Sequence, residues 1–347
     1  MNEPTVSIVI PARNEARHIA RCLDSILSQD YPRGLTEVLV VDGMSSDRTR
    51  DIVRGYCERH PRVKLVDNPN RTAPSGVNIG IRAATGEILM RADAHSEYPS
   101  DYARRCVELL VSTGAANAGG RIIPVPNGTG VWARPIARLQ AHRFGVGNGA
   151  FRTRATPGFV DTVPFGTFRR EIFDEIGFFD ERLTRNQDNE LNARLVRAGY
   201  KIAYDPGIRI DYKNKETLSE LSSYAFNSGM WNVYTQKLHP HAFQARRFVP
   251  ALFVLYLFTL AAAGVLPAAL RRVYALPLAA YALLCAVSAA DRRFSAIENL
   301  RMAVVFCAHH VSYGFGTAYG AVNLLTGRWR YYLGRPRPDA ADIPPRQ

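Results

Sequence analysis

Residues 1–240 alternate short apolar runs with segments whose apolar positions have helical spacing. The apolar runs cover residues 5–11, 37–42, 63–67 and 87–91. Between them, helical spacing is seen at Ile19, Cys22, Leu23 and Ile26, at Ile52, Val53 and Tyr56, and at Val77, Ile79, Ile81 and Ala84. Repeated strand, helix and strand predict an α/β fold with a mostly parallel sheet and helices on both faces.

The ends of these predicted strands are the first place to look for a ligand site. In parallel sheets, ligands bind at the carboxyl ends of the strands. Residues 12–15, 42–47, 68–71 and 92–96 follow the four predicted strands. No G-x-G-x-x-G follows the first strand and no G-x-x-x-x-G-K-[ST] occurs, so dinucleotide-binding and P-loop interpretations lose their main support.

Three polar side chains after the strands have two interpretations each. The Asp42 carboxylate can accept hydrogen bonds from a nucleobase or ribose, or it can cap the next helix at its amide-rich start. Asp93 and His95 lie two residues apart on a loop and can both bind Mn²⁺ or Mg²⁺, leaving coordination positions for diphosphate oxygens. The alternative for this pair is a turn carboxylate and a surface histidine.

The last third of the chain holds three long uncharged runs. Residues 248–270 form 23 uncharged positions between Arg247 and Arg271, and residues 273–290 and 302–327 add 18 and 26. A membrane helix needs about 20 apolar residues, so the first run predicts a span. The other two are open as spans, re-entrant segments or packed helices, and a buried hairpin of a soluble domain is the alternative. We expect two or three membrane-inserted helices, and domains at 1–240, 241–330 and a basic, proline-rich tail at 331–347.

The charge balance favours a lipid partner. The chain has 44 Lys and Arg against 31 Asp and Glu, a net charge of +13, which is compatible with nucleic-acid binding. However, the arginines of the last third lie beside apolar runs, so anionic membrane lipids are the expected partner and nucleic acid is not. Five cysteines without a C-x-x-C pair, and a start without a secretory signal, favour a reducing cytoplasmic setting.

Five segments carry a family resemblance. They are SIVIPARNEARHI, EVLVVDGMSSDRT, NIGIRAATGEILMRADAH, PFGTFRREIFDEIGFFDE and NQDNELNARLVRAGYKI, in this order. Together they resemble the inverting family-two glycosyltransferases with the GT-A nucleotide-sugar-binding fold, most of all the bacterial exopolysaccharide branch, whose members also have a hydrophobic C-terminal region. The resemblance implies a nucleotide-sugar donor, expected to be UDP-glucose, and an acceptor glycan on polyprenyl diphosphate. It also implies a place at the bacterial inner membrane, with the catalytic domain on the cytoplasmic side.

The resemblance also assigns roles to residues. It implies donor contacts from Pro11, Arg13, Glu15, Asp42, Arg71, Asn78 and Asp93. The family's usual Asp-x-Asp metal motif is here Asp93-Ala94-His95, so Asp93 and His95 are the expected ligands of a divalent cation, Mn²⁺ or Mg²⁺.

The expected catalytic base is Asp188. An inverting transfer needs a base that takes the proton of the acceptor hydroxyl. The family's Glu-Asp pair is here Gln187-Asp188, and the alternative for Asp188 is a helix cap. Acceptor contacts are expected from Gly166, Thr167, Arg169 and Trp231, although such an arginine is often solvated and Trp231 is equally an interfacial anchor. A polyprenyl-phosphate sugar synthase, or a catalytically silent membrane scaffold that binds glycan, are the alternative functions.

Overall fold

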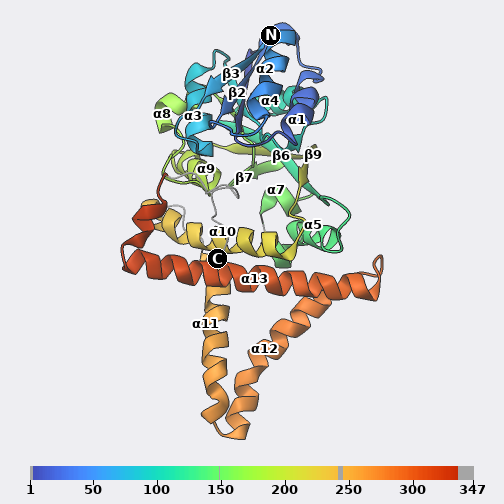
Figure 1. The fold of residues 1–347 in the computed structure, drawn as a ribbon, viewed down its shortest axis with the longest axis vertical. Helices are drawn as coiled ribbons and strands as arrows, with labels where there is room; N and C mark the ends of the chain where they lie inside the picture. Colours follow the sequence, from blue (N-terminus) through green and yellow to red (C-terminus); the bar gives the residue numbers. More distant parts are fainter. Residues whose placement is uncertain (1–2, 148, 241–244, 335–347) are drawn as a thin grey trace. The chain divides into compact units, whose positions relative to one another are not determined.

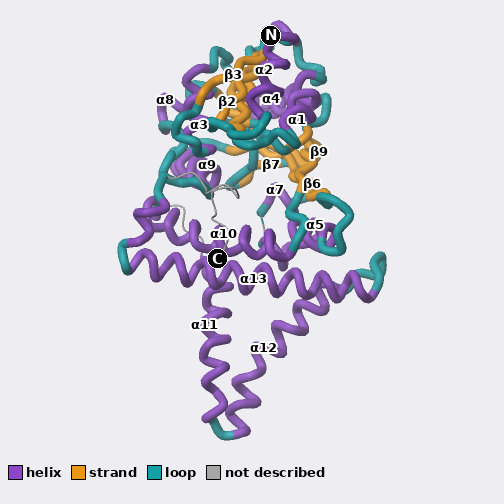
Figure 2. Tube along the Cα trace, viewed as in Figure 1, coloured by secondary structure: helices purple, strands orange, loops and turns teal. Residues whose placement is uncertain are grey.

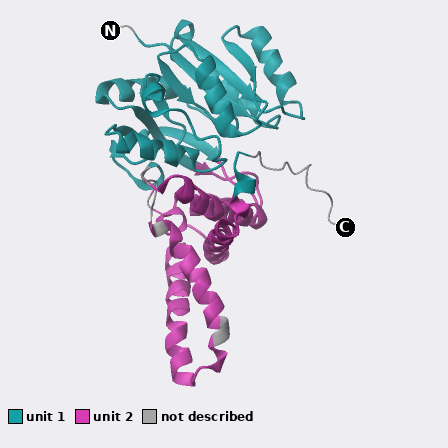
Figure 3. Cartoon of the chain, turned by 90° about the vertical axis from the view of Figure 1, so that its left-hand side faces the viewer, with its two compact units in different colours: residues 1–123, 150–212, 330–347 teal, residues 124–149, 213–329 magenta. Residues whose placement is uncertain are grey.

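The chain folds into two compact units. A computed structural model describes residues 3–147, 149–240 and 245–334. Unit 1 comprises residues 1–123, 150–212 and 330–347, and unit 2 comprises residues 124–149 and 213–329 (Figure 3). Residues 124–149 and 213–240 therefore group with the C-terminal helices and not with the predicted domain 1–240. Most of the expected tail, residues 335–347, lies outside the described residues.

Unit 1 is built on one mixed sheet (Figures 1 and 2). Its strands are β1 (Val6–Ala12), β2 (Thr36–Asp42), β3 (Val63–Asp67), β4 (Ile88–Arg91), β5 (Ser96–Glu97), β6 (Asn117–Val125), β7 (Gly158–Val160), β8 (Thr167–Arg169) and β9 (Ile202–Lys213). Their order is β3-β2-β1-β4-β8-β6-β9-β5, and β7 pairs with β9.

The four strands predicted from the sequence form the parallel part of this sheet. Val6 of β1 pairs with Thr36 of β2 and with Ile88 of β4, and Asp42 of β2 pairs with Asp67 of β3. Their carboxyl ends therefore meet at one edge. The predicted α/β sheet is confirmed, and β4–β8, β6–β8, β5–β9 and β7–β9 add antiparallel pairs.

Helices cover both faces of the sheet. Those of unit 1 are α1 (Ile19–Leu27), α2 (Thr49–Arg59), α3 (Ala73–Ala83), α4 (Tyr102–Thr113), α7 (Ala150–Thr153), α8 (Ile172–Ile176) and α9 (Gln187–Arg197), with a short 3-10 turn at Arg33–Leu35. Side chains alternate along β1, because successive residues of a strand point to opposite faces. Ile8 packs in a core cluster with α1, α2 and α4, whereas Val9 packs in a second cluster with α3 and α9.

Unit 2 is helical. It contains α5 (Ala133–Ala141), α6 (Arg143–Val146), α10 (Leu218–Leu238), α11 (Val249–Ala262), α12 (Ala268–Ala289) and α13 (Ala296–Leu325), with 3-10 turns at Ala245–Phe248 and Ala263–Val265 and another, Arg328–Tyr332, at its boundary with unit 1. Its core joins Ile136 and Leu139 of α5 to Val305 and Phe306 of α13.

The expected membrane span at residues 248–270 is wrong as a single helix. Helix α11 ends at Ala262, a turn containing Gly264 and Pro267 follows, and α12 begins at Ala268. Proline lacks the amide hydrogen that a continuing helix requires, so the break has a local cause. Among the described helices, α12 alone is long and apolar enough to cross a membrane, judged by length and composition, and the apolar part of α11, Val249–Leu260, is shorter.

Candidate active site

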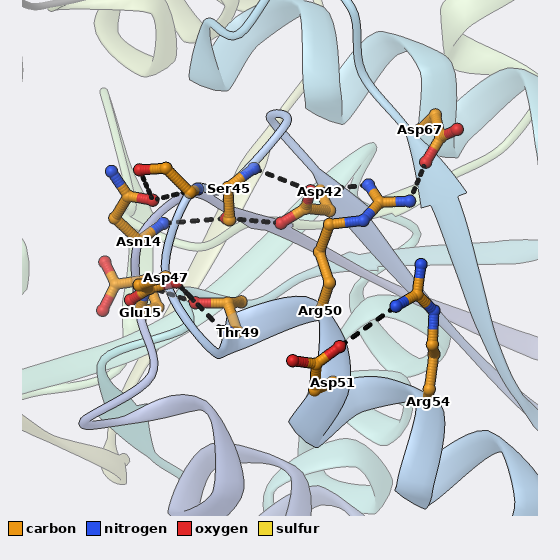
Figure 4. A network of polar contacts seen from close by, with 11 residues as sticks. Asn14, Glu15, Asp42, Ser45, Asp47, Thr49, Arg50, Asp51, Arg54 and Asp67 are labelled. Atoms are coloured by element: carbon orange, nitrogen blue, oxygen red, sulfur yellow. Dashed lines mark hydrogen bonds and ion pairs between the residues drawn. The ribbon is translucent and has the colours of Figure 1, made fainter.

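The loops after β1 and β2 are joined into one polar surface. The Asn14 amide N–H donates to Ser45 Oγ at 2.9 Å, and Asn14 Oδ1 accepts from the Ser46 N–H at 2.9 Å. The Glu15 N–H donates to Thr49 Oγ1, in the first turn of α2, at 2.8 Å (Figure 4). These bonds fix the two strand-end loops relative to each other.

Asp42 is buried beneath this polar surface and holds the loop after β2 through hydrogen bonds. Its side chain is 0% exposed and accepts from the Ser45 N–H at 3.0 Å, from Ser45 Oγ at 2.5 Å and from Arg50 at 2.8 Å. Arg50 also donates to Asp67 at 2.8 Å (Figure 4), and its hydrogen bonds to the two carboxylates raise its pKa. The N-cap of α2 is Arg48, so Asp42 holds the loop and does not cap the helix. A contact between Asp42 and a nucleoside stays a prediction.

Left-handed backbone conformations gather around these strand ends. Among the described residues, the non-glycine residues with positive φ are Asn14 (54°), Met44 (55°), Arg71 (59°), Phe165 (49°) and Asn186 (63°). The first three follow β1, β2 and β3, and the other two precede β8 and α9. Such conformations cost about 1–3 kcal/mol each and tend to occur at functional sites. They support a candidate site at this edge of the sheet.

Arg13 and Arg71 both pack against Gly43, the residue after β2. A Cβ atom added to Gly43 would lie 3.2 Å from Arg13 Cβ and 3.4 Å from Arg71 Cα, so both residues pack against this glycine. Pro11 lies against Gly76 at the start of α3, where an added Cβ would be 3.2 Å away. Three of the predicted donor-side residues therefore surround the ends of β1, β2 and β3.

A buried arginine joins the end of β4 to α9. Arg91 is 6% exposed, and its guanidinium donates to the carboxylate of Asp188 in the first turn of α9. Its backbone N–H donates to the Gly166 carbonyl at 3.0 Å. Burial lowers the pKa of Arg91, but the attraction of Asp188 and Asp93 outweighs burial and the net shift is upward. The sequence interpretation missed Arg91, although a single cation ending an apolar strand beside Ala92-Asp93 was a usable signal.

Asp188 remains open to solvent. Its side chain is 32% exposed. The N-cap of α9 is Asn186, and no side chain forms a cap hydrogen bond there, so the alternative role of Asp188 as a cap is excluded. A carboxylate that is held on one side and hydrated on the other has the geometry that a general base needs. Its function as the base stays a prediction.

Asp93, His95 and Glu15 form a second polar group. His95 Nε2 lies 3.7 Å from Asp93 Oδ2, and His95 Nδ1 lies 3.3 Å from Glu15 Oε1. The Asp93 N–H donates to the Tyr98 hydroxyl at 2.7 Å, and the His95 ring meets the ring of Tyr212 edge-on at 5.6 Å. These contacts orient the loop after β4.

The donor set of this group fits a divalent cation through two ligands. Within residues 3–147, 149–240 and 245–334, no three His, Cys, Asp or Glu side chains are arranged to hold a metal ion. The two nitrogens of His95 face different carboxylates, so one ion can join Asp93 and His95 but not all three residues. One carboxylate and one imidazole suit Mn²⁺, with the remaining positions left to phosphate and water oxygens.

The structure gives Asn78 a structural role in place of the expected donor contact. Its side chain is buried and donates to the Phe179 carbonyl and to Glu181, both at 2.9 Å, and its Oδ1 accepts from the Phe179 N–H at 3.0 Å. Both functional groups of the amide are thus engaged. Asn78 clamps the segment after α8 onto α3.

The expected acceptor residues are also engaged elsewhere. A Cβ on Gly166 would lie 2.5 Å from Asn117 Oδ1, and Thr167 is 0% exposed. Arg169 donates to two backbone carbonyls at the end of α4, at 3.2 and 3.4 Å. Trp231 is 5% exposed in α10, packed edge-on against a tyrosine ring at 5.4 Å, which leaves it neither a stacking surface nor an interfacial anchor. Burial therefore speaks against contacts from Gly166, Thr167 and Trp231, whereas Arg169 is partly exposed and is held by the two carbonyls.

Comparison with known proteins shows which proteins this chain resembles. Residues 7–177 match the family described as Glycosyl transferase family 2. The chain is 35% identical over 197 residues to the succinoglycan biosynthesis protein ExoA of Rhizobium meliloti (strain 1021), a match that covers 56% of this chain and 59% of that protein, less than two thirds of its length. It is 26% identical over 232 residues to the dolichyl N-acetyl-alpha-D-glucosaminyl phosphate 3-beta-D-2,3-diacetamido-2,3-dideoxy-beta-D-glucuronosyltransferase of Methanococcus voltae, covering 65% of this chain and 71% of that protein.

A solved structure shares the fold. The mannosyltransferase PcManGT from Pyrobaculum calidifontis, in complex with GDP-Man and Mn²⁺, superposes with a TM-score of 0.61 over 90% of this chain and 88% of that chain. At 22% identity this likeness concerns the fold alone. Residues 7–177, just under half of the chain, are thus similar to glycosyl transferase family 2, in a chain with the GT-A fold followed by C-terminal helices.

Proposed function

We propose that this protein is an inverting glycosyltransferase that moves a sugar from a nucleotide sugar to a hydroxyl group of a lipid-linked glycan. One observation carries the proposal. Arg91 ends β4 and holds the solvent-open Asp188, and two residues later Asp93 begins the loop with His95. A candidate base and a candidate metal site therefore lie near one strand end, which supports a single reaction that uses both.

The residues of this edge have distinct roles in the proposed reaction. Asp188 accepts the proton of the acceptor hydroxyl while that oxygen bonds to the anomeric carbon of the sugar. The bond from this carbon to the diphosphate oxygen breaks, and the diphosphate keeps the electron pair. Arg13 and Arg71 lie at the end of β2, where their charge would stabilise the departing diphosphate. Asp93 and His95 would hold Mn²⁺ or Mg²⁺, which neutralises diphosphate charge when bound.

A relative and the apolar helix α12 support a proposed donor, acceptor and location. The likeness to a succinoglycan biosynthesis protein supports exopolysaccharide synthesis, with UDP-glucose as donor and a polyprenyl-diphosphate-linked oligosaccharide as acceptor. The apolar helix α12 supports attachment to the bacterial inner membrane, with unit 1 on the cytoplasmic side. Confining the enzyme and a lipid-linked acceptor to one surface raises their effective concentration.

A transfer assay with purified full-length protein tests the proposal. Radiolabelled nucleotide sugars, Mn²⁺ and extracted lipid-linked acceptors are combined, and the labelled lipid is analysed. Asp188→Asn should lower transfer by about 10²–10⁴-fold and keep donor affinity, because only the proton acceptor is lost. Asp174→Asn, an exposed carboxylate on α8, is the matched control and should transfer normally.

Two results would contradict parts of this proposal. Normal transfer by Asp188→Asn would remove Asp188 as the base. A labelled product with a single sugar joined to the lipid through one phosphate would identify the protein as a polyprenyl-phosphate sugar synthase instead.

A further inference from the structure

Helices α11 and α12 form an antiparallel hairpin with apolar outer surfaces. The ring centroids of Phe253 and Tyr281 are 4.3 Å apart, and those of Tyr256 and Tyr274 are 5.5 Å apart. The Tyr256 hydroxyl donates to the Tyr274 carbonyl at 2.8 Å. The later residue of α11, Tyr256, thus pairs with the earlier residue of α12, Tyr274. The two helices therefore run in opposite directions on either side of the turn at 263–267 (Figure 2).

The outside of the hairpin exposes large apolar side chains along its whole length. They are Val249, Leu252, Leu255, Phe258, Val265, Leu270, Val273, Leu276, Leu283, Leu284 and Val287. Val265, at the turn, is 92% exposed. Water is a poor environment for a surface of this extent on a single protein.

Arginines delimit this surface at both ends. Arg247 precedes α11, Arg271 and Arg272 lie in the first turns of α12 near the tip, and Arg292 and Arg293 follow α12 at the base. Between Arg272 and Arg292, residues 273–290 carry no charge. As a helix, these 18 residues span about 27 Å, close to the hydrocarbon thickness of about 30 Å. Helix α11 is shorter, but its 14 residues and the 3 residues of the 3-10 turn that follows rise about 27 Å together. The charges at the base and at the tip are therefore spaced to reach both headgroup layers.

This spacing argues against a shallow, re-entrant loop. A hairpin that entered the bilayer and turned back within it would place Arg271 and Arg272 in hydrocarbon, where arginine is strongly disfavoured. A hairpin that crosses fully places both arginines at the far headgroups, where they are solvated.

Helix α13 does not add a third crossing. Its Gly316 and Gly320 lie against the backbone of α10, where an added Cβ would collide with main-chain atoms. Helix α10 carries the exposed charges of Glu220 and Lys237, so it belongs in water. Because α13 packs along α10, it cannot lie in the hydrocarbon core, although residues 302–327 are uncharged.

Instead, α13 runs across the base of the hairpin. An added Cβ on Gly314 would touch Pro250 and Val254 of α11, and Met302 and Phe306 share a cluster with the end of α12. Its other face exposes Ile297, Leu300, Val304, Val322 and Leu325. A long helix with one packed face and one exposed apolar face suits the plane of the membrane surface.

We propose that the α11–α12 hairpin crosses a phospholipid bilayer twice, with its tip on the far side and α13 lying on the near surface. Near the base are Arg247, Arg292, Arg293, Arg301 and Arg328, against Arg271 and Arg272 at the tip. Because the more basic side of a membrane protein faces the cytoplasm, the base and both flanking parts of the chain are cytoplasmic. This inference rests on the membrane attachment proposed above but not on the transfer chemistry.

Cysteine labelling in bacterial spheroplasts tests this topology. The full-length protein is first freed of its accessible thiols by Cys57→Ser and Cys307→Ser. Three single cysteines are then introduced at exposed positions: Val265→Cys at the tip, Ala290→Cys at the base and Thr326→Cys after α13. A membrane-impermeant maleimide is applied to intact and to permeabilised spheroplasts. Labelling in detergent confirms that each thiol is present and reactive, and it requires no enzymatic activity.

The proposal predicts that Val265→Cys is labelled equally in both conditions, whereas Ala290→Cys and Thr326→Cys are labelled only after permeabilisation. Protection of all three in intact spheroplasts would overturn the double crossing in favour of a re-entrant loop. Labelling of both Val265→Cys and Thr326→Cys in intact spheroplasts, without Ala290→Cys, would establish a third crossing. Labelling of Ala290→Cys in intact spheroplasts would show the opposite orientation. Release of the protein by alkaline carbonate would show that it does not cross the bilayer. Loss of sugar transfer leaves all these readouts intact, so failure of the proposed chemistry is distinguishable.

Discussion

The ion pair between Arg91 and Asp188 offers the sharpest test of the site. Arg91→Met keeps an unbranched apolar side chain and removes the guanidinium that holds Asp188. The bond joins a 6% exposed arginine to a 32% exposed carboxylate, so Asp188 can hydrate when it is released. A hydrogen bond to a charged group contributes about 1.5–3 kcal/mol. If that energy serves to hold the base in position, its loss corresponds to about a 10- to 150-fold decrease in rate.

Steady-state kinetics separate positioning from binding. Arg91→Met should lower kcat by about 10- to 150-fold and leave the KM for the nucleotide sugar unchanged, because Asp188 acts only on the acceptor. Arg91→Lys should recover part of kcat, since it restores the charge but not the fixed fork of donors. Thermal unfolding of each variant checks that the fold is intact.

Arg170→Met is the matched control. Arg170 follows β8 directly and donates to the carbonyls of Ala84 and Gly86, so its loss removes comparable bonds without touching Asp188. It should lower Tm and leave kcat unchanged. If Arg91→Met lowers Tm to the same extent but keeps kcat within about twofold, the ion pair is only structural and the positioning role is refuted.

Other predictions address the metal site, the α3 clamp and the sheet. Asp93→Ala should weaken Mn²⁺-dependent donor binding by about 10- to 100-fold, measured by calorimetry with and without Mn²⁺. Asn78→Ala should lower the free energy of unfolding by about 1–3 kcal/mol, because the Phe179 backbone loses its partners, while donor affinity measured by titration stays unchanged. Burial raises the pKa of Glu37, but hydrogen bonds, above all from Lys64, prevail and lower it from 4.5 to about 2. The ionised Glu37 therefore stabilises the fold above pH 4.5 and this contribution is lost as the pH falls through about 2, so denaturation curves of wild type and Glu37→Gln should converge in acid.

The parallel half of the sheet could be predicted because its signals are local. The strands expected at 37–42 and 63–67 are β2 (Thr36–Asp42) and β3 (Val63–Asp67), within a residue at each end. Apolar runs of this length and helical spacing between them depend only on neighbouring residues. The break between α11 and α12 was equally visible, since Gly264 and Pro267 interrupt the uncharged run, but hydropathy averaged over the run conceals it.

The roles of polar residues could not be predicted, because they depend on partners far along the chain. Asn78 and Phe179 are 101 residues apart, and Arg91 and Asp188 are 97 apart. The resemblance implied an acceptor contact from Thr167, yet β8 lies between β4 and β6, where Thr167 is buried. Residue type and spacing indicate which groups can bind a ligand, but not which of them are already bound to one another.

At two strand ends the structure shows which side chain holds a predicted site carboxylate, and in both it is an arginine. Arg50 holds Asp42 at the end of β2, and Arg91 of β4 holds Asp188 of α9. In each case an arginine helps to fix the orientation of a carboxylate, at Asp42 together with Ser45. The backbone around them, at Met44 for example, is left-handed and therefore carries strain that the surrounding bonds must offset. Dipoles and charges oriented before a substrate arrives need no reorganisation during the reaction, which is the condition under which electrostatic stabilisation of a transition state is largest.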